Sequence, residues 1–237
     1  MVRDLASQRN LLALPVDRQS ARIVAHCLAL LFARHGPPLV LKSDNGGPFI
    51  AGVVTDLLAR QRVAHLRSPV YTPRYNGAVE SSGGWLKART ASIAACSALA
   101  SPSPQPCCPW WTSDHIETAR LQANAFGRPW GSRGPTPDQV WDRRPPITRQ
   151  ARAEFQVRLA VCRRVIADSR RASWPRPGVS PQPQPDVAPN NLPVLPAGQR
   201  SSVDRAAISR ALVELGYLKV RSTSPLSTHS RSQNGKD

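Results

Sequence analysis

Two carboxylates, Asp44 and Glu80, stand where the sequence predicts functional positions. Asp44 follows a short apolar run and lies in the turn-forming sequence K-S-D-N-G-G. We therefore expect it at the carboxyl end of a strand, where the sites of α/β sheets collect. Glu80 lies in Y-N-G-A-V-E, at the predicted start of a helix, where the helix dipole favours an acid. Two carboxylates that converge there could hold Mg²⁺, which also binds waters and phosphate oxygens. Such a site suits an in-line phosphoryl displacement.

The elements that would position these acids follow an α/β pattern over about the first hundred residues. The apolar runs predict strands at 10–16, 39–42 and 63–66 and helices at 20–34, 49–62 and 78–98, with a Pro-containing loop at 68–76. Strand, helix, strand, helix, strand, loop and helix predict an α/β fold with a partly parallel sheet.

The rest of the chain is predicted to be helical and rich in Arg and Pro. A Pro-rich break at 101–109 precedes a helix at 113–125, an irregular loop at 129–147 and an Arg-rich helix at 149–168. Eight prolines between Pro175 and Pro196 exclude a helix or a central strand and predict a stiff, disordered linker. A short helix at 202–215 and a polar tail follow. The predicted domains are a core at 1–99, a post-core helical region at 100–171, a linker at 172–200, a C-terminal helix at 201–220 and a disordered tail at 221–237.

The formal net charge of +17 and the pI of about 11.3 predict a polyanionic partner, with DNA as the first candidate. An anionic membrane surface is the alternative, but the longest apolar stretch, 23–33, is interrupted by His26 and is too short to span a bilayer. No apolar leader opens the chain, so we expect a cytoplasmic, nucleoid-associated protein without a membrane partner. The five cysteines lack the paired spacing of a zinc module and predict reduced thiols.

Together, K-S-D-N-G-G-P-F and S-P-V-Y-T-P-R-Y-N-G-A-V-E-S resemble the catalytic core of the DDE integrases and transposases of retroviruses and insertion sequences. In that family the second Asp lies in a D-N-G turn, and the catalytic Glu follows a P-x-x-x-G-x-x-E loop after thirty-five intervening residues. Thirty-five residues also separate Asp44 from Glu80. The resemblance covers residues 3–89. It implies a ribonuclease H-like mixed sheet flanked by helices and a homo-oligomeric enzyme that uses Mg²⁺ or Mn²⁺. Water, and then a DNA 3′-hydroxyl, would attack phosphodiester bonds.

The same resemblance implies DNA contacts. Asn76 matches a polar loop residue near the substrate end, and Lys87 matches a basic helix residue that contacts DNA. Tyr71 and Arg74 lie on the same loop, where base stacking or phosphate contact is plausible. An ordinary solvated surface is the alternative for these residues. We expect Trp85 to pack in the core.

The sequence departs from the family at the first catalytic Asp, which family members carry on the central strand. Asp4 lies in R-D-L-A-S-Q-R, which resembles the later family segment that turns from the second strand into the third, so we do not expect it to bind metal. The resemblance therefore implies that the first, central strand and one of three metal carboxylates are absent, and that the chain is truncated at its N-terminus. Gly83 and Gly84 also weaken the predicted helix.

Downstream, R-P-W-G-S-R-G-P-T-P-D-Q-V-W-D-R-R-P-P-I resembles the segment after the core in insertion-sequence integrases, where T-P-x-x-x-W sits in a helix and loop. Arg143, Arg144 and the Arg-rich helix after them could lie along phosphates or form a solvated face. The last helix could dock on the core or belong to a DNA-binding appendage, and its sequence favours neither.

Two functions remain as hypotheses. The first is DNA integration by a metal-dependent polynucleotidyl transferase, inactive in this chain if the truncation is real. The second is a non-catalytic DNA-binding remnant or a regulator of a full-length integrase. A ribonuclease H-like nuclease with another substrate is disfavoured, because the two motifs together resemble integrases.

Overall fold

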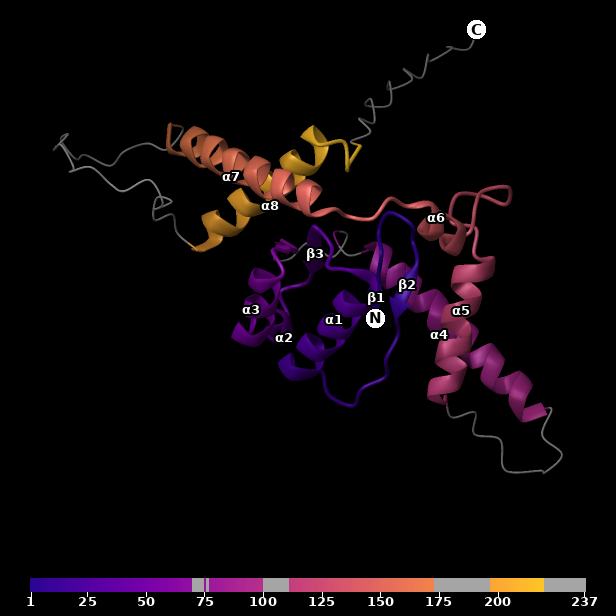
Figure 1. Ribbon diagram of the computed structural model, residues 1–237. Coiled ribbons are helices and arrows are strands. Elements are labelled where there is room, and N and C mark those ends of the chain that lie inside the picture. The colour runs from indigo at the N-terminus through magenta and orange to yellow at the C-terminus, as the bar shows by residue number, and fades with distance from the viewer. Residues whose placement is uncertain (70–74, 76, 100–110, 173–196, 220–237) are drawn as a thin grey trace, which may run out of the picture.

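The computed structural model describes residues 1–69, 75, 77–99, 111–172 and 197–219 (Figure 1). In these residues the elements are β1 (Val2–Arg3), β2 (Asn10–Leu12), α1 (Ala21–His35), β3 (Val40–Ser43), α2 (Gly47–Ile50), α3 (Gly52–Arg60), β4 (Ala64–Arg67), α4 (Gly77–Leu99), α5 (Ser113–Phe126), α6 (Pro137–Arg143), α7 (Arg149–Ala172) and α8 (Ala197–Glu214). The predicted α/β class is confirmed, with a larger share of helix than of strand.

The strands of the described residues form two separate pairs. β1 and β2 pair antiparallel, with Val2 opposite Leu12. β3 and β4 pair parallel, from Val40 opposite Ala64 to Ser43 opposite Arg67. Parallel and antiparallel pairing both occur, as predicted for a mixed sheet, but no strand in the described part of the chain joins the two pairs. A central strand is the element that the sequence predicted to be absent.

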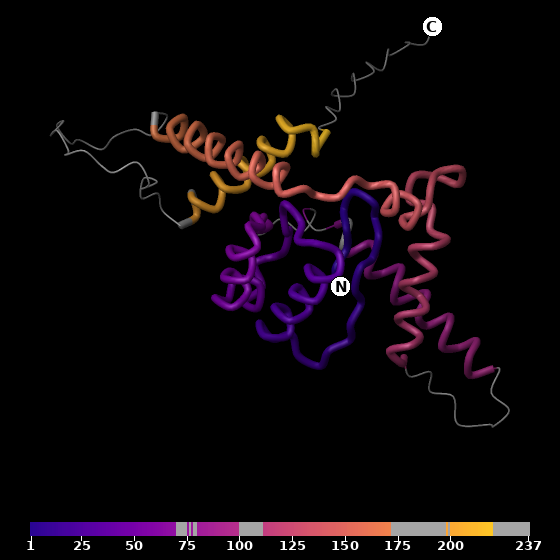
Figure 2. The backbone as a smooth tube through the Cα atoms, viewed as in Figure 1, coloured from indigo at the N-terminus to yellow at the C-terminus, as the bar shows by residue number. Residues whose placement is uncertain are grey.

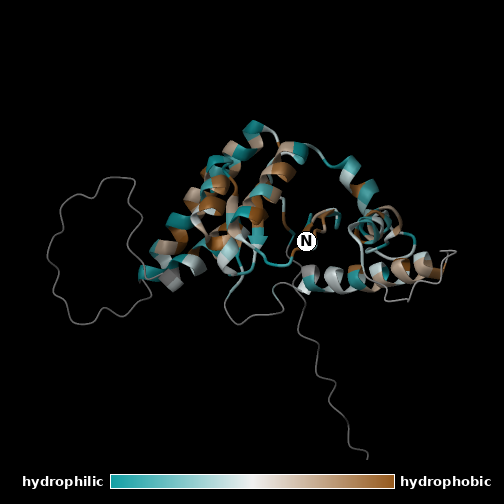
Figure 3. Cartoon of the chain, turned by 90° about the horizontal axis from the view of Figure 1, so that it is seen from below, coloured by the Kyte–Doolittle hydropathy of each residue, from teal (hydrophilic) through white to brown (hydrophobic). Residues whose placement is uncertain are grey.

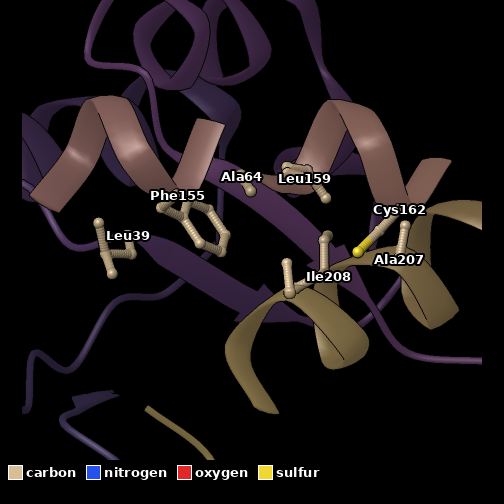
Figure 4. Packing of buried hydrophobic residues seen from close by; sticks show 8 residues of the cluster. Leu39, Ala64, Phe155, Leu159, Cys162, Ala207 and Ile208 are labelled. Atoms are coloured by element: carbon tan, nitrogen blue, oxygen red, sulfur yellow. The ribbon is translucent and has the colours of Figure 1, made fainter. Parts of the chain in front are cut away.

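Helices cover both faces of the parallel pair. α1 and α3 enclose one core, whose buried members are Val24, Ala25, Leu28, Phe32, Val54, Leu58 and Val63. α7 and α8 enclose a second core, whose buried members are Leu39, Ala64, Phe155, Leu159, Cys162, Ala207, Ile208 and Ala211 (Figure 4). Successive side chains of a strand point to opposite faces, and accordingly Val40 packs against the second core and Leu41 against the first.

The last two helices therefore dock on the core, which decides between the two alternatives for the C-terminal helix. α8 packs against both α7 and β4. In Figure 2 the orange and yellow C-terminal helices accordingly lie beside the violet segments that hold β3 and β4. The helices carry both polar and apolar residues in Figure 3, as amphipathic helices at a core boundary do.

One arginine fastens the beginning of α7 to the sheet. The Arg152 guanidinium donates hydrogen bonds to the carbonyl oxygens of Pro37 and Pro38, just before β3, the latter at 2.8 Å. Gln156 donates to the carbonyl oxygen of Arg62, just before β4, at 2.9 Å. These donors satisfy backbone acceptors at the amino ends of both strands. Asp44 lies at the other end of the pair, directly after the carboxyl end of β3.

The β1–β2 pair packs on the helices α4, α5 and α6 instead. α5 contacts β2, α4 and α6; in Figure 1, α4 and α5 run toward the lower right and α6 lies above them. The side chain of Ser82 on α4 donates to Asn10 Oδ1 on β2 at 3.0 Å. The first strand pair is thus tied to the helix that carries Glu80.

Most helices agree with prediction, because their end signals are local. Ser20 caps α1 by accepting a hydrogen bond from the Ile23 amide, and Gly36 ends the helix with a φ of 78°. The predicted helix at 49–62 is instead two helices, because Ala51 is extended with a ψ of 147°. α8 begins at Ala197, inside the range predicted as linker, directly after the last proline of that range.

The prediction of an irregular loop at 129–147 is wrong for α6. Thr136 accepts a hydrogen bond from the Gln139 amide at 3.2 Å, and Gln139 Oε1 accepts from the Thr136 amide at 2.9 Å. This reciprocal capping box, with Pro137 in the first turn, is enough to start a short helix.

Three predicted segments lie wholly or largely outside the described residues: the Pro-rich break at 101–109, the linker and the C-terminal tail. In the described ranges, no helix is both long and apolar enough to cross a bilayer.

Candidate active site

Asp44 directly follows β3, at the carboxyl edge of the parallel strand pair. Its side chain is exposed, and Oδ1 accepts a hydrogen bond from the Gly46 amide at 2.9 Å. A Cβ atom at Gly46 would lie 3.0 Å from Asp44 Oδ1, so a side chain there would crowd the carboxylate. The D-N-G turn thus holds one carboxylate oxygen and leaves the other toward solvent.

A buried polar contact between the strands supports this turn. The Ser68 amide and Ser68 Oγ both donate to the Ser43 carbonyl oxygen at 2.9 Å, which extends the ladder past the end of the strands. Asn45 Nδ2 donates to the Ser68 carbonyl oxygen at 2.7 Å. The residues on both sides of Asp44 are therefore anchored to the segment after β4.

His65 lies beneath the turn, on β4. Ser43 Oγ donates to the Asp44 carbonyl oxygen at 2.8 Å and lies 2.8 Å from His65 Nε2. Because a hydroxyl has one proton, the geometry assigns the Nε2 proton to His65, with Ser43 Oγ as acceptor. Burial, and then the charge of Arg67, lower the pKa of His65 below its usual value, so the ring is neutral at neutral pH.

Lys42 connects β3 to the beginning of α4. Its Nζ donates a hydrogen bond to the Tyr75 carbonyl oxygen and lies 4.0 Å from the centroid of the Tyr75 ring. Burial lowers the pKa of Lys42. α4 begins at Gly77, two residues after Tyr75, so this contact ties the start of the helix to the strand that ends before Asp44.

Glu80 lies in the first turn of α4, as predicted, and its side chain is exposed. Both predicted acids thus sit on segments that Lys42 and Tyr75 connect. Lys42 belongs to the K-S-D-N-G-G sequence, but the sequence alone predicts no role for it. Lys42 and Tyr75 are thirty-three positions apart, and no local sequence pattern predicts a contact between residues so far apart in the chain.

Among the predicted DNA contacts, Lys87 is an exposed residue of α4, two helical turns after Glu80 and on the same side of the helix. Tyr71, Arg74 and Asn76 lie outside the described residues. The interpretation of Trp85 as a core residue is wrong, because its side chain is 49% exposed. α4 buries the stripe of Leu86, Thr90 and Ala94, and Trp85 lies to the side of that stripe.

The donor types at this edge suit a hard divalent cation. Asp44 and Glu80 provide carboxylate oxygens, which Mg²⁺ and Mn²⁺ favour together with water. In the described ranges, no three side chains among His, Cys, Asp and Glu gather closely enough to hold a metal ion. Asp4 is engaged elsewhere, since its Oδ2 accepts hydrogen bonds from the amide and hydroxyl of Ser7 at 2.7 and 2.6 Å.

The fold resembles solved structures of integrases. The catalytic core domain of BIV integrase matches with a TM-score of 0.40 at 24% identity, over 53% of this chain and 73% of that chain. The simian T-cell lymphotropic virus intasome matches with a TM-score of 0.43 at 20% identity, over 56% of this chain and 45% of that chain. The HTLV-2 integrase catalytic core domain, described as a dimeric form in complex with magnesium, matches with a TM-score of 0.37 at 17% identity. The match covers 52% of this chain and 70% of that chain.

These TM-scores are all below 0.5, and the likeness assigns no role to a residue. No protein-family model and no curated protein matches the sequence.

Proposed function

We propose that this chain acts in DNA integration, as the catalytic part of a metal-dependent enzyme that cleaves and joins DNA strands. Asp44 and Glu80 are its catalytic carboxylates. The observation that carries the proposal is the Lys42–Tyr75 contact. It ties the start of the helix that bears Glu80 to the strand that ends before Asp44. The thirty-five intervening residues and the position at the carboxyl edge of parallel strands support the same assignment.

Asp44 and Glu80 would hold the Mg²⁺ or Mn²⁺. When bound, the metal would stabilise the charge that develops on the phosphate oxygens during displacement. The chain's own contribution is to position the acids: the Gly46 amide orients Asp44, and Lys42 holds the start of α4. Attack by water on a phosphodiester would break the P–O bond to the 3′ oxygen. The resulting 3′-hydroxyl would then attack a second phosphodiester, forming a new bond from its oxygen to phosphorus while the 3′ oxygen of the attacked strand leaves as a hydroxyl.

The proposed partner is DNA, held by a basic surface that includes Lys87. Tyr71, Arg74 and Asn76 complete the proposed DNA contacts. The net charge of +17 supports a polyanionic partner, because each neutralised phosphate releases counterions. We also propose a homo-oligomer as the working unit and the nucleoid, in the cytoplasm, as its location. The homo-oligomer follows from the motif resemblance alone, and the nucleoid location follows from the positive net charge.

A specific observation favours a second candidate, a DNA-binding remnant or regulator without catalysis. Neither acid belongs to a group of three metal-binding side chains in the described part of the chain, whereas the family that the motifs resemble uses three carboxylates. Loss of one member of a catalytic set removes most of the activity. The second candidate predicts salt-sensitive DNA binding that does not depend on the two acids.

Strand cleavage and strand transfer by the full chain would separate the two candidates. The substrate is a labelled linear DNA in Mg²⁺ or Mn²⁺, and the variants are Asp44→Asn and Glu80→Gln. Asp56→Asn, at an exposed position of α3, is the matched control. The proposal expects metal-dependent products that fall at least about a thousandfold in both variants and not in the control. DNA binding without metal-dependent products, equal in all four proteins, would leave the second candidate.

A further inference from the structure

A second group of aromatic and cationic side chains surrounds Trp141 on α6, away from the candidate active site. Trp141 is 9% exposed. The guanidinium carbon of Arg144 lies 3.3 Å from the centroid of its ring system, and that of Arg9 lies 5.1 Å away. The imidazole of His35 meets the same ring edge-on, with centroids 5.2 Å apart and planes at 88°.

His35, Trp141 and Arg144 border a cavity between the end of α1 and the segment that joins α6 to α7. Its volume is about 400 Å³, within the range of roughly 300–1,000 Å³ typical of small-ligand sites. His35, Trp141 and Arg144 line it together with the apolar side chains of Pro37, Pro146 and Ile147. The cavity therefore offers an apolar wall beside a guanidinium group.

Arg144 differs from the other arginines around Trp141 in what it contacts. Arg9 Nε lies 2.8 Å from Asp138 Oδ1, an ion pair without hydrogen-bond alignment. Arg120 Nε donates to Glu117 Oε2 at 2.7 Å. In the described residues the Arg144 guanidinium has no hydrogen bond and no ion pair, and burial lowers its pKa without removing its charge. Its planar donors are available to a ligand in the cavity.

The electrostatic surroundings favour an anion at this place. The pKa of His35 is lowered by burial, and then by the positive charges of Arg34, Arg9, Arg144 and Arg120. The ring is therefore neutral at neutral pH and can share a proton with a ligand. Two carboxylates oppose this field: Asp142 lines the cavity from an exposed position, and the charge of Asp4 offsets part of the lowering of the Arg144 pKa by burial.

We infer that this cavity binds one nucleotide unit of a DNA strand, with the phosphate on Arg144 and the base or sugar against the apolar wall. The inference rests on the proposed function, because that function makes DNA the ligand. Guanidinium groups recognise phosphate through two parallel hydrogen bonds. The apolar wall beside Arg144 adds a surface for a nucleobase, which a bare anion does not need. The site would hold DNA at the junction of the core and α7.

The test measures binding of a fluorescent single-stranded oligothymidylate of about ten nucleotides to the full chain, without divalent metal. Arg144→Ala should weaken binding about tenfold, because a hydrogen-bonded charge pair is lost. Arg144→Lys keeps the charge and should recover only part of the affinity, because it lacks the planar donors. Arg143→Ala is the matched control: Arg143 is the exposed neighbour on α6, does not line the cavity, and should cost less than about twofold.

A second pair of variants keeps the test decisive if Arg144→Ala does not fold. Ile147→Glu adds an acid at the cavity wall at a position that is already 37% exposed, and should also weaken binding about tenfold. Val157→Glu adds the same charge on α7, at a position 67% exposed, and should have less effect.

Equal losses in Arg144→Ala and Arg143→Ala, or in the two glutamate variants, would overturn the inference and leave only general charge attraction. Failure of the native chain to bind the oligothymidylate would also overturn it. Metal-dependent cleavage of linear DNA, and its loss in Asp44→Asn, is measured separately, so the proposed function can stand when this inference fails.

Discussion

Asn10 and Asn124 form a reciprocal, buried pair of hydrogen bonds across 114 positions of the chain. The Asn10 amide donates to Asn124 Oδ1 at 2.9 Å, and Asn124 Nδ2 donates to the Asn10 carbonyl oxygen at 3.0 Å. Arg120 also donates to that carbonyl at 2.7 Å. The side chain of Asn124 thus provides both groups that a neighbouring strand would offer to β2 at this residue. One helix residue replaces part of a strand ladder and holds α5 against β2.

The first prediction follows from this pair. Asn124→Leu leaves the Asn10 amide buried without an acceptor, so the free energy of unfolding should fall by about 1–3 kcal/mol. Urea denaturation followed by circular dichroism measures the change. Gln122→Ala is the control, because Gln122 lies on the same helix as Asn124 and accepts an exposed hydrogen bond from Arg89 of α4; the change should cost less than about 0.5 kcal/mol. Equal stability of the two variants would contradict the structural role of Asn124.

The local parts of this fold were predictable from the sequence. Ser20 and Gly36 bracket α1, and the position of Glu80 in a first helical turn follows from the residues around it. α6 also had a local signal, the T-P-D-Q sequence of its capping box. Seven residues leave too little apolar periodicity to indicate a helix, so a helix here was expected only from the resemblance of the T-P-x-x-x-W segment.

Contacts between distant segments were not predictable. No local pattern pairs Asn10 with Asn124, Lys42 with Tyr75, or Arg152 with the carbonyl oxygens before β3, because each depends on how helices pack after the strands have formed. Trp85 illustrates the same limit. An aromatic residue in a helix is expected in a core, but packing buried the neighbouring stripe of α4 instead. The Arg144 cavity also arises from segments that meet only in three dimensions.

The second prediction concerns the connection between Lys42 and Tyr75. Lys42→Met removes the hydrogen bond and the cation–π contact that hold the segment before α4, at a cost of about 1 kcal/mol. Backbone amides in the first turns of α4 should then exchange with deuterium faster, by about fivefold. Mass spectrometry of peptides covering residues 77–90 measures the exchange.

Lys87→Met is the control for this prediction, because it removes an equal charge from an exposed position of α4 itself. Unchanged exchange in Lys42→Met, or an equal increase in both variants, would show that Lys42 does not hold the helix.

The third prediction concerns pH. The pKa of His65 is lowered in the folded chain, mainly by burial, so between that pKa and the usual value of about 6.5 the unfolded chain binds more protons. The free energy of unfolding should therefore fall as the pH drops below about 6.5, until the folded His65 is also protonated. His65→Gln, whose amide can still donate to Ser43 Oγ, should flatten this part of the profile. Denaturation at a series of pH values measures it. A His65→Gln profile that falls as steeply below pH 6.5 as that of the native chain would contradict the role of His65.

The fourth prediction uses the two glycines that follow the D-N-G turn. A Cβ at Gly46 would lie 3.0 Å from Asp44 Oδ1, whereas a Cβ at Gly47 would meet no atom within 4 Å. The φ of Gly46 is −55°, so alanine can adopt its backbone and only the contact with Asp44 changes. Gly46→Ala should displace the carboxylate by a few tenths of an ångström and slow metal-dependent strand cleavage about tenfold, because misplaced catalytic groups lose rate steeply. Gly47→Ala should keep the native rate, and both variants should keep the native melting temperature within a few degrees. A Gly46→Ala protein that cleaves as fast as the Gly47→Ala protein would mean that the position of Asp44 does not limit the reaction.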